Sequence, residues 1–158
     1  MKNKRTNLFA LLFILVKFNG LAQSIVKDKK GLDVYEGALV LFNKPNPNSY
    51  TDSMAVHKFL QVTSILEPTK RNAIVLYNCY EKAGILKQTY GFQRQAVELY
   101  KKAIACRSLY KLPESLQFKP YLYCGAAYFQ LSLFDSSQYY LKKSEAVLLK
   151  YPNQQEGQ

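Results

Sequence analysis

Few residues in this 158-residue chain are of the kinds that carry out catalysis or bind metals. It has one histidine, three cysteines and 11 acidic residues against 22 basic ones. The cysteines lack the paired C-x-x-C spacing of a zinc or redox site. The sequence also contains no glycine-rich phosphate loop, no catalytic pair of carboxylates and no cluster of metal ligands. We therefore expect no catalytic residues, no metal site and no cofactor, and we do not expect an enzyme.

The histidine and the cysteines fit structural positions. A catalytic histidine needs a nucleophile or carboxylate held beside it, and we expect His57 to be exposed or partly packed on a helix. Cys79, Cys106 and Cys124 fall at helix positions that take small apolar residues, and free cysteine behaves as a small hydrophobe. A disulfide between Cys106 and Cys124 is the alternative in an oxidising compartment. Because three is an odd number, at least one thiol is unpaired within the chain.

Residues 1–22 have the three parts of a secretory signal peptide. A basic start precedes the apolar run Leu8–Val16, and Gly20 and Ala22 are small residues suited to cleavage before Gln23. The run has nine residues, whereas a spanning helix needs about 20, so an uncleaved anchor is the weaker alternative. No cysteine precedes Cys79, which excludes a lipid-modified N-terminus. We predict a protein exported to the periplasm or secreted after cleavage near Ala22.

Export would change the charge of the protein. The signal holds four of the 22 bases and no acid, so 18 bases and 11 acids remain and the formal charge falls from +11 to +7. The remaining basic residues are spread along the chain instead of forming an arm, and an exported protein rarely meets nucleic acid. We expect no nucleic-acid binding. The remaining chain of about 136 residues fits one domain.

A repeat of 41 residues organises the rest of the chain. Each copy has a small, a large and a small residue at offsets of four and three, which is one helix face. The three sets are Ala55, Phe59 and Val62, then Ala96, Tyr100 and Ala103, then Ser137, Leu141 and Ser144. An upstream helix aligns too, since Gly84 corresponds to Gly125. We expect Ala96 and Ala103 to be buried, and the two glycines to let paired helices approach closely.

These residues resemble the tetratricopeptide repeat. The third copy carries "PYLYCGAAYFQLSLFDSSQYYLKKSEAVLLKYP" (120–152), and the second (77–107) departs from the family pattern at Lys87, where a tyrosine is usual. The resemblance implies an all-α, right-handed α-solenoid of about three helix-turn-helix units over residues 31–152. A linker (23–30) would precede the solenoid and a tail (153–158) would follow it. The period of 41 instead of 34 places the extra residues in the loop 108–120.

The first copy is the least regular. Residues 32–42 read as its first helix, followed by the proline-rich turn 43–52. Asp52 or Thr51 would cap the second helix, which ends near Leu66 because a proline follows Glu67. The 41-residue register places the close approach of the two helices at Asn43, where no glycine stands.

The signal, the loop "FNKPNPNSYTDS" and the stretch "GFQRQAVELYKKAI" look similar to the N-terminal part of long exported bacterial repeat proteins. Some of those proteins end in a caspase-like CHAT peptidase domain. Nothing of that peptidase is present here, so this resemblance concerns the scaffold alone.

In the tetratricopeptide family the first helices line a concave groove that binds a protein or peptide. The resemblance places nine residues in this groove: Asn78, Glu81, Ile85, Gln88, Lys119, Leu122, Ala126, Phe129 and Gln130. Glu81 and Leu122 stand where lysines would grip a carboxylate, so an extended or helical peptide suits the groove better than a C-terminal carboxylate. The alternative is that these residues form the ordinary surface of a spacer.

Two further surfaces follow from the repeat. The pairs Lys101–Lys102 and Lys142–Lys143 are equivalent and would lie on the convex face, either as solvated surface or in contact with anionic lipid. On the last helix, expected over 136–150, Tyr140, Val147 and Tyr151 fall on the side where another unit would dock. An open apolar face there would allow self-association.

The sequence thus predicts an exported scaffold for protein–protein interaction. The alternative is a sensory or regulatory input module, cut from a longer repeat protein whose output domain is absent.

We predict that the exported protein begins at Gln23 or within a residue or two of it, because the small residues that suit signal peptidase lie just before that position. N-terminal sequencing of protein from the exported fraction measures this directly. Recovery of an intact Met1 would instead support the uncleaved anchor.

Overall fold

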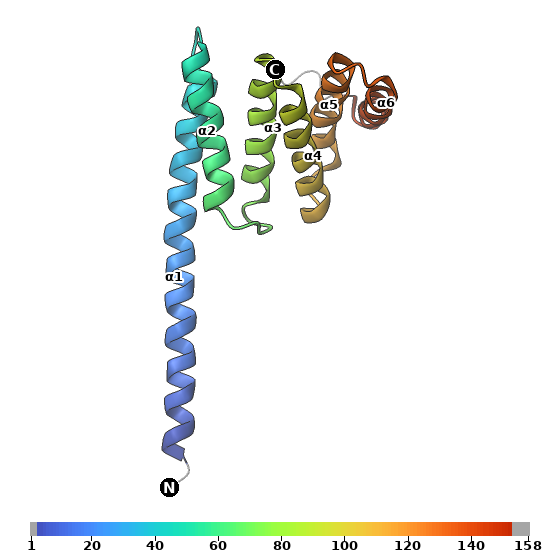
Figure 1. The fold of residues 1–158 in the computed structure, drawn as a ribbon. Coiled ribbons are helices and arrows are strands. Elements are labelled where there is room, and N and C mark those ends of the chain that lie inside the picture. Colours follow the sequence, from blue (N-terminus) through green and yellow to red (C-terminus); the bar gives the residue numbers. More distant parts are fainter. Residues whose placement is uncertain (1–2, 153–158) are drawn as a thin grey trace.

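The chain is all-helical over residues 3–152, the part that the structure, a computed structural model, describes; side chains are described from Gln23 onward. Within these residues, six α-helices and one short 3₁₀ helix follow one another (Figure 1). They are α1 (Asn3–Phe42), α2 (Ser49–Ile65), α3 (Ala73–Thr89), α4 (Gln93–Tyr110), η1 (Glu114–Gln117), α5 (Phe118–Gln130) and α6 (Phe134–Lys150). Over these residues the expectation of an all-α fold is confirmed.

The helices pack in sequential pairs. The closest packing joins α1 to α2, α3 to α4 and α5 to α6, so the described part of the chain forms three helical hairpins. Neighbouring hairpins meet through α2 with α3 and α4 with α5, and α3 also touches both α1 and α5. The three hairpin turns lie at the same end of the molecule (Figure 1). The binding surfaces therefore depend on which helix faces these contacts cover.

Two glycines set the distance between paired helices, as the repeat predicts. A Cβ atom on Gly84 of α3 would lie 2.6 Å from Cε1 of Tyr100 on α4. A Cβ atom on the equivalent Gly125 of α5 would lie 2.7 Å from Cγ of Leu141 on α6. Because carbon atoms do not approach so closely without bonding, only glycine fits these two positions without a shift of the packing.

Small residues on α4 complete this packing. Ala96 and Ala103 are fully buried, which confirms their expected place between helices. Ala103 belongs to the larger apolar core, which joins the first hairpin to α3 and α4. Ala96 and Tyr100 belong to a second core, with Cys124 and Ala127 of α5. The α4 helix thus has one buried side for each neighbouring hairpin.

The first hairpin departs from the predicted register. Its turn has six residues (43–48), whereas the turns 90–92 and 131–133 have three each. The rings of Tyr35 and Phe42 flank Phe59 of α2, at centroid distances of 6.2 and 6.0 Å. Ala38, on the same face of α1 between them, is fully buried. The close approach therefore falls at Ala38, and the expectation for Asn43 was wrong because the longer turn shifts the pairing.

The start of α2 also differs from the expectation. Asn48 is the N-cap, and neither Thr51 nor Asp52 fills that role. The Asn48 side chain accepts from the backbone N–H of Thr51, whose hydroxyl oxygen in turn accepts from the N–H of Asn48. This reciprocal pair satisfies two backbone donors that a helix start leaves unpaired. Asp52 is buried and accepts a hydrogen bond from the Tyr90 hydroxyl at 2.6 Å instead.

The two connections between hairpins have the same length. Residues 66–72 and 111–117 are seven-residue connections, so the second one is shorter than the predicted loop 108–120. In that region α4 continues to Tyr110, and Pro120 lies in the first turn of α5, where its missing N–H costs no helical hydrogen bond. Residues 108–110 and 118–120 of the predicted loop are therefore helical.

The segment 23–30 is helical instead of a linker. It continues α1, and its Asp28 is buried against the connection 66–72. Asn72 donates to Asp28 at 3.0 Å, and Arg71 forms an ion pair with it at 3.5 Å. Tertiary contacts therefore hold this segment in the domain.

Some predictions concern parts that the structure does not describe. The side chains of the predicted signal (1–22) and the tail 153–158 lie outside the described residues. Within the described residues, no helix has the length and apolar character needed to cross a membrane.

Replacing Gly84 by alanine should destabilise the protein by about 1–3 kcal/mol, because the added methyl group collides with the buried Tyr100 ring. Gly37→Ala is the matched control. There the nearest atom is Nζ of Lys58 at 3.6 Å, which leaves room for the methyl group. Gly37→Ala should stabilise the protein by about 0.5–1 kcal/mol, the usual gain within a helix. Urea titration of both variants measures the difference, and equal effects would contradict the proposed close packing.

Candidate functional site

The expected groove residues on α3 mostly serve contacts between helices. Asn78 donates to the Tyr35 hydroxyl of α1 at 3.1 Å. Gln88 donates to Gln130 of α5 at 3.1 Å and accepts from the Tyr100 hydroxyl at 2.8 Å. Ile85 is half-buried against the second core, which contains Tyr100. The structure therefore brings these residues together along the first helices of the hairpins but uses their polar groups internally.

Glu81 is a buried carboxyl group in this row. It is 8% exposed, and burial raises its pKa above the usual value; Lys82 and Lys119 oppose that rise. The hydroxyl of Tyr77 lies 3.4 Å from Oε1 of Glu81 and 2.5 Å from the carbonyl oxygen of Leu116. Its single proton can go to only one of the two at a time. Glu81 thus lies at the junction of the second and third hairpins, with little exposure to a partner.

The expected groove residues on α5 are more accessible. Lys119, Leu122 and Ala126 are half-buried, while Phe129 and Gln130 are exposed. Leu122 and Phe129 line a hollow between α5 and α6. They are the two members of the predicted set that contribute an apolar surface to it.

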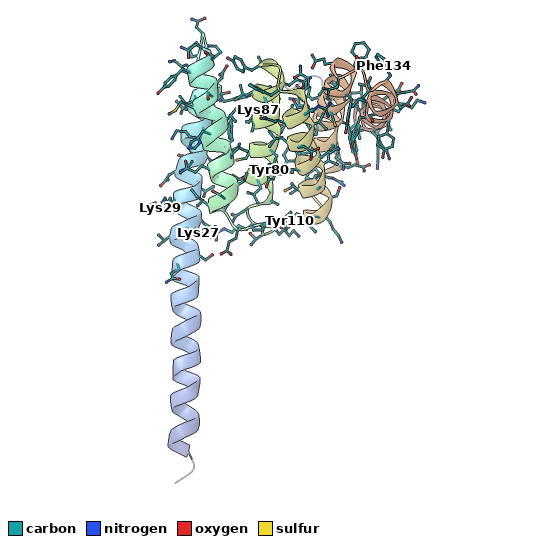
Figure 2. The ribbon with its side chains drawn as sticks, viewed as in Figure 1. Lys27, Lys29, Tyr80, Lys87, Tyr110 and Phe134 are labelled. Atoms are coloured by element: carbon teal, nitrogen blue, oxygen red, sulfur yellow. The ribbon has the colours of Figure 1, made fainter. Side chains whose placement is uncertain are left out.

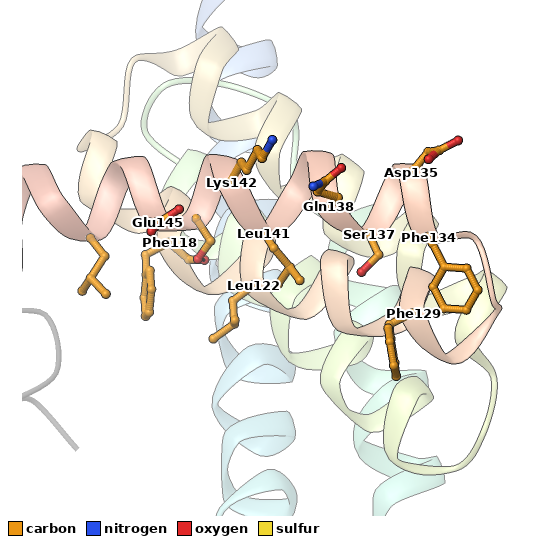
Figure 3. A pocket seen from close by; sticks show the side chains of 12 residues that line it. Phe118, Leu122, Phe129, Phe134, Asp135, Ser137, Gln138, Leu141, Lys142 and Glu145 are labelled. Carbon is orange, nitrogen blue, oxygen red and sulfur yellow. The ribbon is translucent and has the colours of Figure 1, made fainter.

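This hollow has a volume of about 860 Å³ and is open to solvent. In Figure 3, the side chains of Phe118, Leu122 and Phe129 project from α5 to the same side as Leu141 of α6. The hydrophilic side chains that border it lie on α6: Asp135, Ser137, Gln138, Lys142, Ser144 and Glu145. Phe134 and Leu148 complete the apolar lining. We call this surface the α5/α6 hollow.

The hollow has a fixed inner wall. Ser144 is buried and donates a hydrogen bond to the carbonyl oxygen of Phe118 at 3.1 Å, which ties α6 to the start of α5. Leu141 lies against Gly125, and the rings of Phe129 and Phe134 meet edge to face at a centroid distance of 5.7 Å. Phe129 and Phe134 are nevertheless 61% and 60% exposed. Aromatic rings exposed to this degree on a rigid wall are available to a partner.

The expectation for the open face of α6 was wrong in its residues. Val147 is buried, and Tyr140 is half-buried, with its ring stacked on Tyr128 of α5 at 5.4 Å. The Tyr151 hydroxyl donates to Glu114 of η1. These three residues face the body of the protein, because α6 turns its other side outward. The 41-residue alignment could have predicted the outward side of α6. Leu141 corresponds to Tyr100, which packs toward the next hairpin.

The groups considered for catalysis remain apart. His57 is exposed on α2. All three cysteines are buried and unpaired, and the Cys106 thiol donates to the carbonyl oxygen of Ala73 at 3.3 Å. Burial raises the pKa of the Cys79 and Cys124 thiols to about 12, which keeps them protonated and unreactive at neutral pH. Among the described residues no group of three or more histidine, cysteine, aspartate or glutamate side chains could hold a metal ion.

The lysines of the second hairpin lie against aromatic rings. Lys101 lies 5.6 Å from the centroid of the Tyr128 ring on α5, and Lys102 lies 5.9 Å from that of Tyr80 on α3. The adjacent lysines therefore point to different hairpins.

Figure 2 places Lys87 and Phe134 towards the end with the hairpin turns, and Tyr110 towards the opposite end.

Three comparisons with known proteins found no relative: no family model, curated protein or solved structure matches the chain.

Replacing Glu81 by glutamine should stabilise the protein at neutral pH, because glutamine removes a buried charge and its amide can donate to Tyr77. Because the pKa of Glu81 is raised in the folded protein, this protein binds more protons than the unfolded chain between about pH 4.5 and the folded-state pKa. The parent therefore loses stability as the pH rises through the folded-state pKa, whereas the variant does not. The gain should be largest at pH 7 and vanish near pH 4.

Urea titrations at both pH values measure this difference. Glu98→Gln is the control, because Glu98 is exposed and its stability change should stay within about 0.5 kcal/mol. A gain for Glu81→Gln that is equal at both pH values would contradict the assigned cause.

Proposed function

We propose that this chain is an exported scaffold of the tetratricopeptide type, a right-handed α-solenoid that binds a protein through the α5/α6 hollow. The repeated hairpin supports the architecture. Gly84 against Tyr100 and Gly125 against Leu141 are equivalent pairs separated by 41 residues, and each joins a first helix to a second helix. Contacts from α1 to α3 and from α3 to α5 support the proposal that the first helices follow one another as in a solenoid.

The proposed function rests mainly on the exposed apolar lining of the hollow. Soluble proteins rarely leave large aromatic side chains together on the surface without a use. Phe129 and Phe134 are mostly exposed yet touch each other, and Leu122 and Leu141 continue their surface between the helices. Hydrophilic side chains along α6 border this surface, and apolar centres with polar edges are typical of protein interfaces.

The rest of the predicted groove plays a supporting part. Asn78 and Gln88 bond to neighbouring hairpins, and the buried Glu81 lies beside Tyr77 of its own helix, so these residues offer a partner little free hydrogen-bonding capacity. Lys119 and Ala126 lie on the same helix as Leu122 and are half-buried. We infer that the second hairpin positions the third, and that the third makes the contact.

Site-specific photo-crosslinking tests this function. A benzoylphenylalanine placed at Phe129 should form covalent adducts with a bound protein in the exporting cell, because that side chain lines the hollow. The same group at Tyr139 is the matched control, since Tyr139 is 57% exposed on α6 but lies outside the hollow. Gel electrophoresis and mass spectrometry would identify the adducts. Equal adducts at both positions, or none at Phe129, would overturn the assignment of the hollow as the binding surface.

A further inference from the structure

The internal repeat shows what kind of surface fits the α5/α6 hollow. Shifted back by 41 residues, Ser137, Gln138 and Leu141 correspond to Ala96, Val97 and Tyr100 of α4. Those three α4 residues form one core with α5, through four residues of that helix: Tyr123, Cys124, Ala127 and Tyr128. In the second hairpin this position is therefore covered by a packed helix.

The first helix of each hairpin gives the same result. Phe118 and Phe129 of α5 correspond to Tyr77 and Gln88 of α3. Tyr77 donates to the carbonyl oxygen of Leu116, in the connection that leads to the following hairpin, and Gln88 donates to Gln130 of that hairpin. The hollow is thus the surface of the third hairpin that, in the second hairpin, holds another pair of helices.

The first end of the row of hairpins carries both charged and apolar side chains. The exposed residues of α1 beyond Asp28 include the charged Lys29, Asp33 and Glu36 as well as the apolar Leu32 and Val40. At the other end, the hollow is lined by apolar and aromatic side chains. A head-to-tail contact between two copies would bury the charges of α1 against these apolar residues, which is costly unless each charge is paired. A contact between two equivalent hollows avoids this cost.

The charges along α6 fit such a contact. Lys142 and the acidic Asp135 and Glu145 border the hollow within three turns of one helix. In a two-fold contact with two antiparallel α6 helices, Lys142 of each copy can lie opposite an acidic residue of the other. Opposite charges at the edge favour this orientation and disfavour others. The same apolar patch then covers itself, as a closed two-fold interface requires.

We propose that the α5/α6 hollow is the two-fold interface of a homodimer, in which the apolar lining of each copy covers that of the other. This inference rests on the proposed function, because it names the protein that the hollow binds. The dimer places the two α1 ends at the far ends of the assembly.

The oligomeric state of the full chain tests the proposal. Sedimentation across the micromolar range should show a monomer–dimer equilibrium. Phe134→Lys should raise the dissociation constant on the order of tenfold or more, because it places a charge within the interface. Tyr139→Lys is the matched control, an aromatic residue of the same helix with similar exposure, and should change the constant by less than about twofold. Circular dichroism checks that both variants remain folded.

A charge exchange tests the two-fold geometry. Lys142→Glu alone, and the double variant Asp135→Lys, Glu145→Lys alone, should each dimerise more weakly than the parent because like charges then face each other. A mixture of the two should form a heterodimer in which every facing pair is again opposite. These three residues are exposed, so the exchanges leave the core intact.

The outcomes separate the dimer from the proposed function. A parent that stays monomeric, equal effects of Phe134→Lys and Tyr139→Lys, or a mixture no stronger than its parts would each overturn the homodimer. Photo-crosslinks from position 129 to a different protein, with a monomeric parent, would overturn the homodimer and still support a binding function for the hollow. All variants share residues 1–22, so a difference between them arises at the hollow.

Discussion

The arrangement of the second and third hairpins depends on the contact between a glycine of one helix and a large side chain of the next. At Gly84 and Gly125 the paired helices come so close that a methyl group would not fit. This closeness buries Ala96, Ala103 and Cys124 and turns α4 into a helix with two packed sides. Both sides of α4 are covered. Among the second helices of the hairpins, α6 is the one whose outward side no described residue covers. The hollow is therefore a consequence of the packing that stabilises the hairpins.

Hydrogen bonds between hairpins fix how each hairpin is positioned along the next. The hydroxyl groups of Tyr77, Tyr90 and Tyr110 reach residues of neighbouring hairpins or connections: Leu116, Asp52 and Pro68. A tyrosine can bury its ring in the core and still satisfy its hydroxyl group at the edge. Apolar contacts alone would tolerate sliding of one hairpin along the next, whereas these hydrogen bonds favour one position. The contacts of Asn78 and Gln88 act in the same way, which explains why few polar groups of the predicted groove remain free.

Much of this fold could be predicted from the sequence because the copies of the repeat can be aligned with one another. The correspondence of Gly84 with Gly125 aligned the first helices of the last two hairpins, and the repeated small–large–small sets aligned the second helices and predicted the buried alanines. The first hairpin could not be placed in the same way, because its six-residue turn leaves Asn43 outside α1 and the rings of Tyr35 and Phe42 lie beside Phe59 instead. The cap of α2 also escaped prediction, because Asn48, Thr51 and Asp52 all have side chains able to cap a helix. Only the structure shows that Asp52 is engaged by Tyr90.

The candidate site was harder to predict than the fold. Helical periodicity distinguishes the two sides of α6 but does not show which one meets α5, so Tyr140 and Val147 were assigned to the wrong side. Leu122 and Phe129 were correctly expected on one helix, but their association with Leu141 and Phe134 depends on how two helices cross. In a similar way, nothing near Asp28 in the sequence indicates that Arg71 and Asn72 would meet it.

The buried Asp28 makes the start of the domain a useful place for a spectroscopic label. Asp28 fixes α1 to the connection between the first and second hairpins, and residues 23–28 are helical. Gln23 lies five positions before Asp28, and at about 1.5 Å per residue this is roughly 8 Å along the helix. A fluorophore at Gln23 would therefore be held at a nearly constant distance from residues 66–72. With a second fluorophore placed within residues 66–72, a change in energy transfer between the two labels would report separation of the first hairpin from the second before the rest of the protein unfolds.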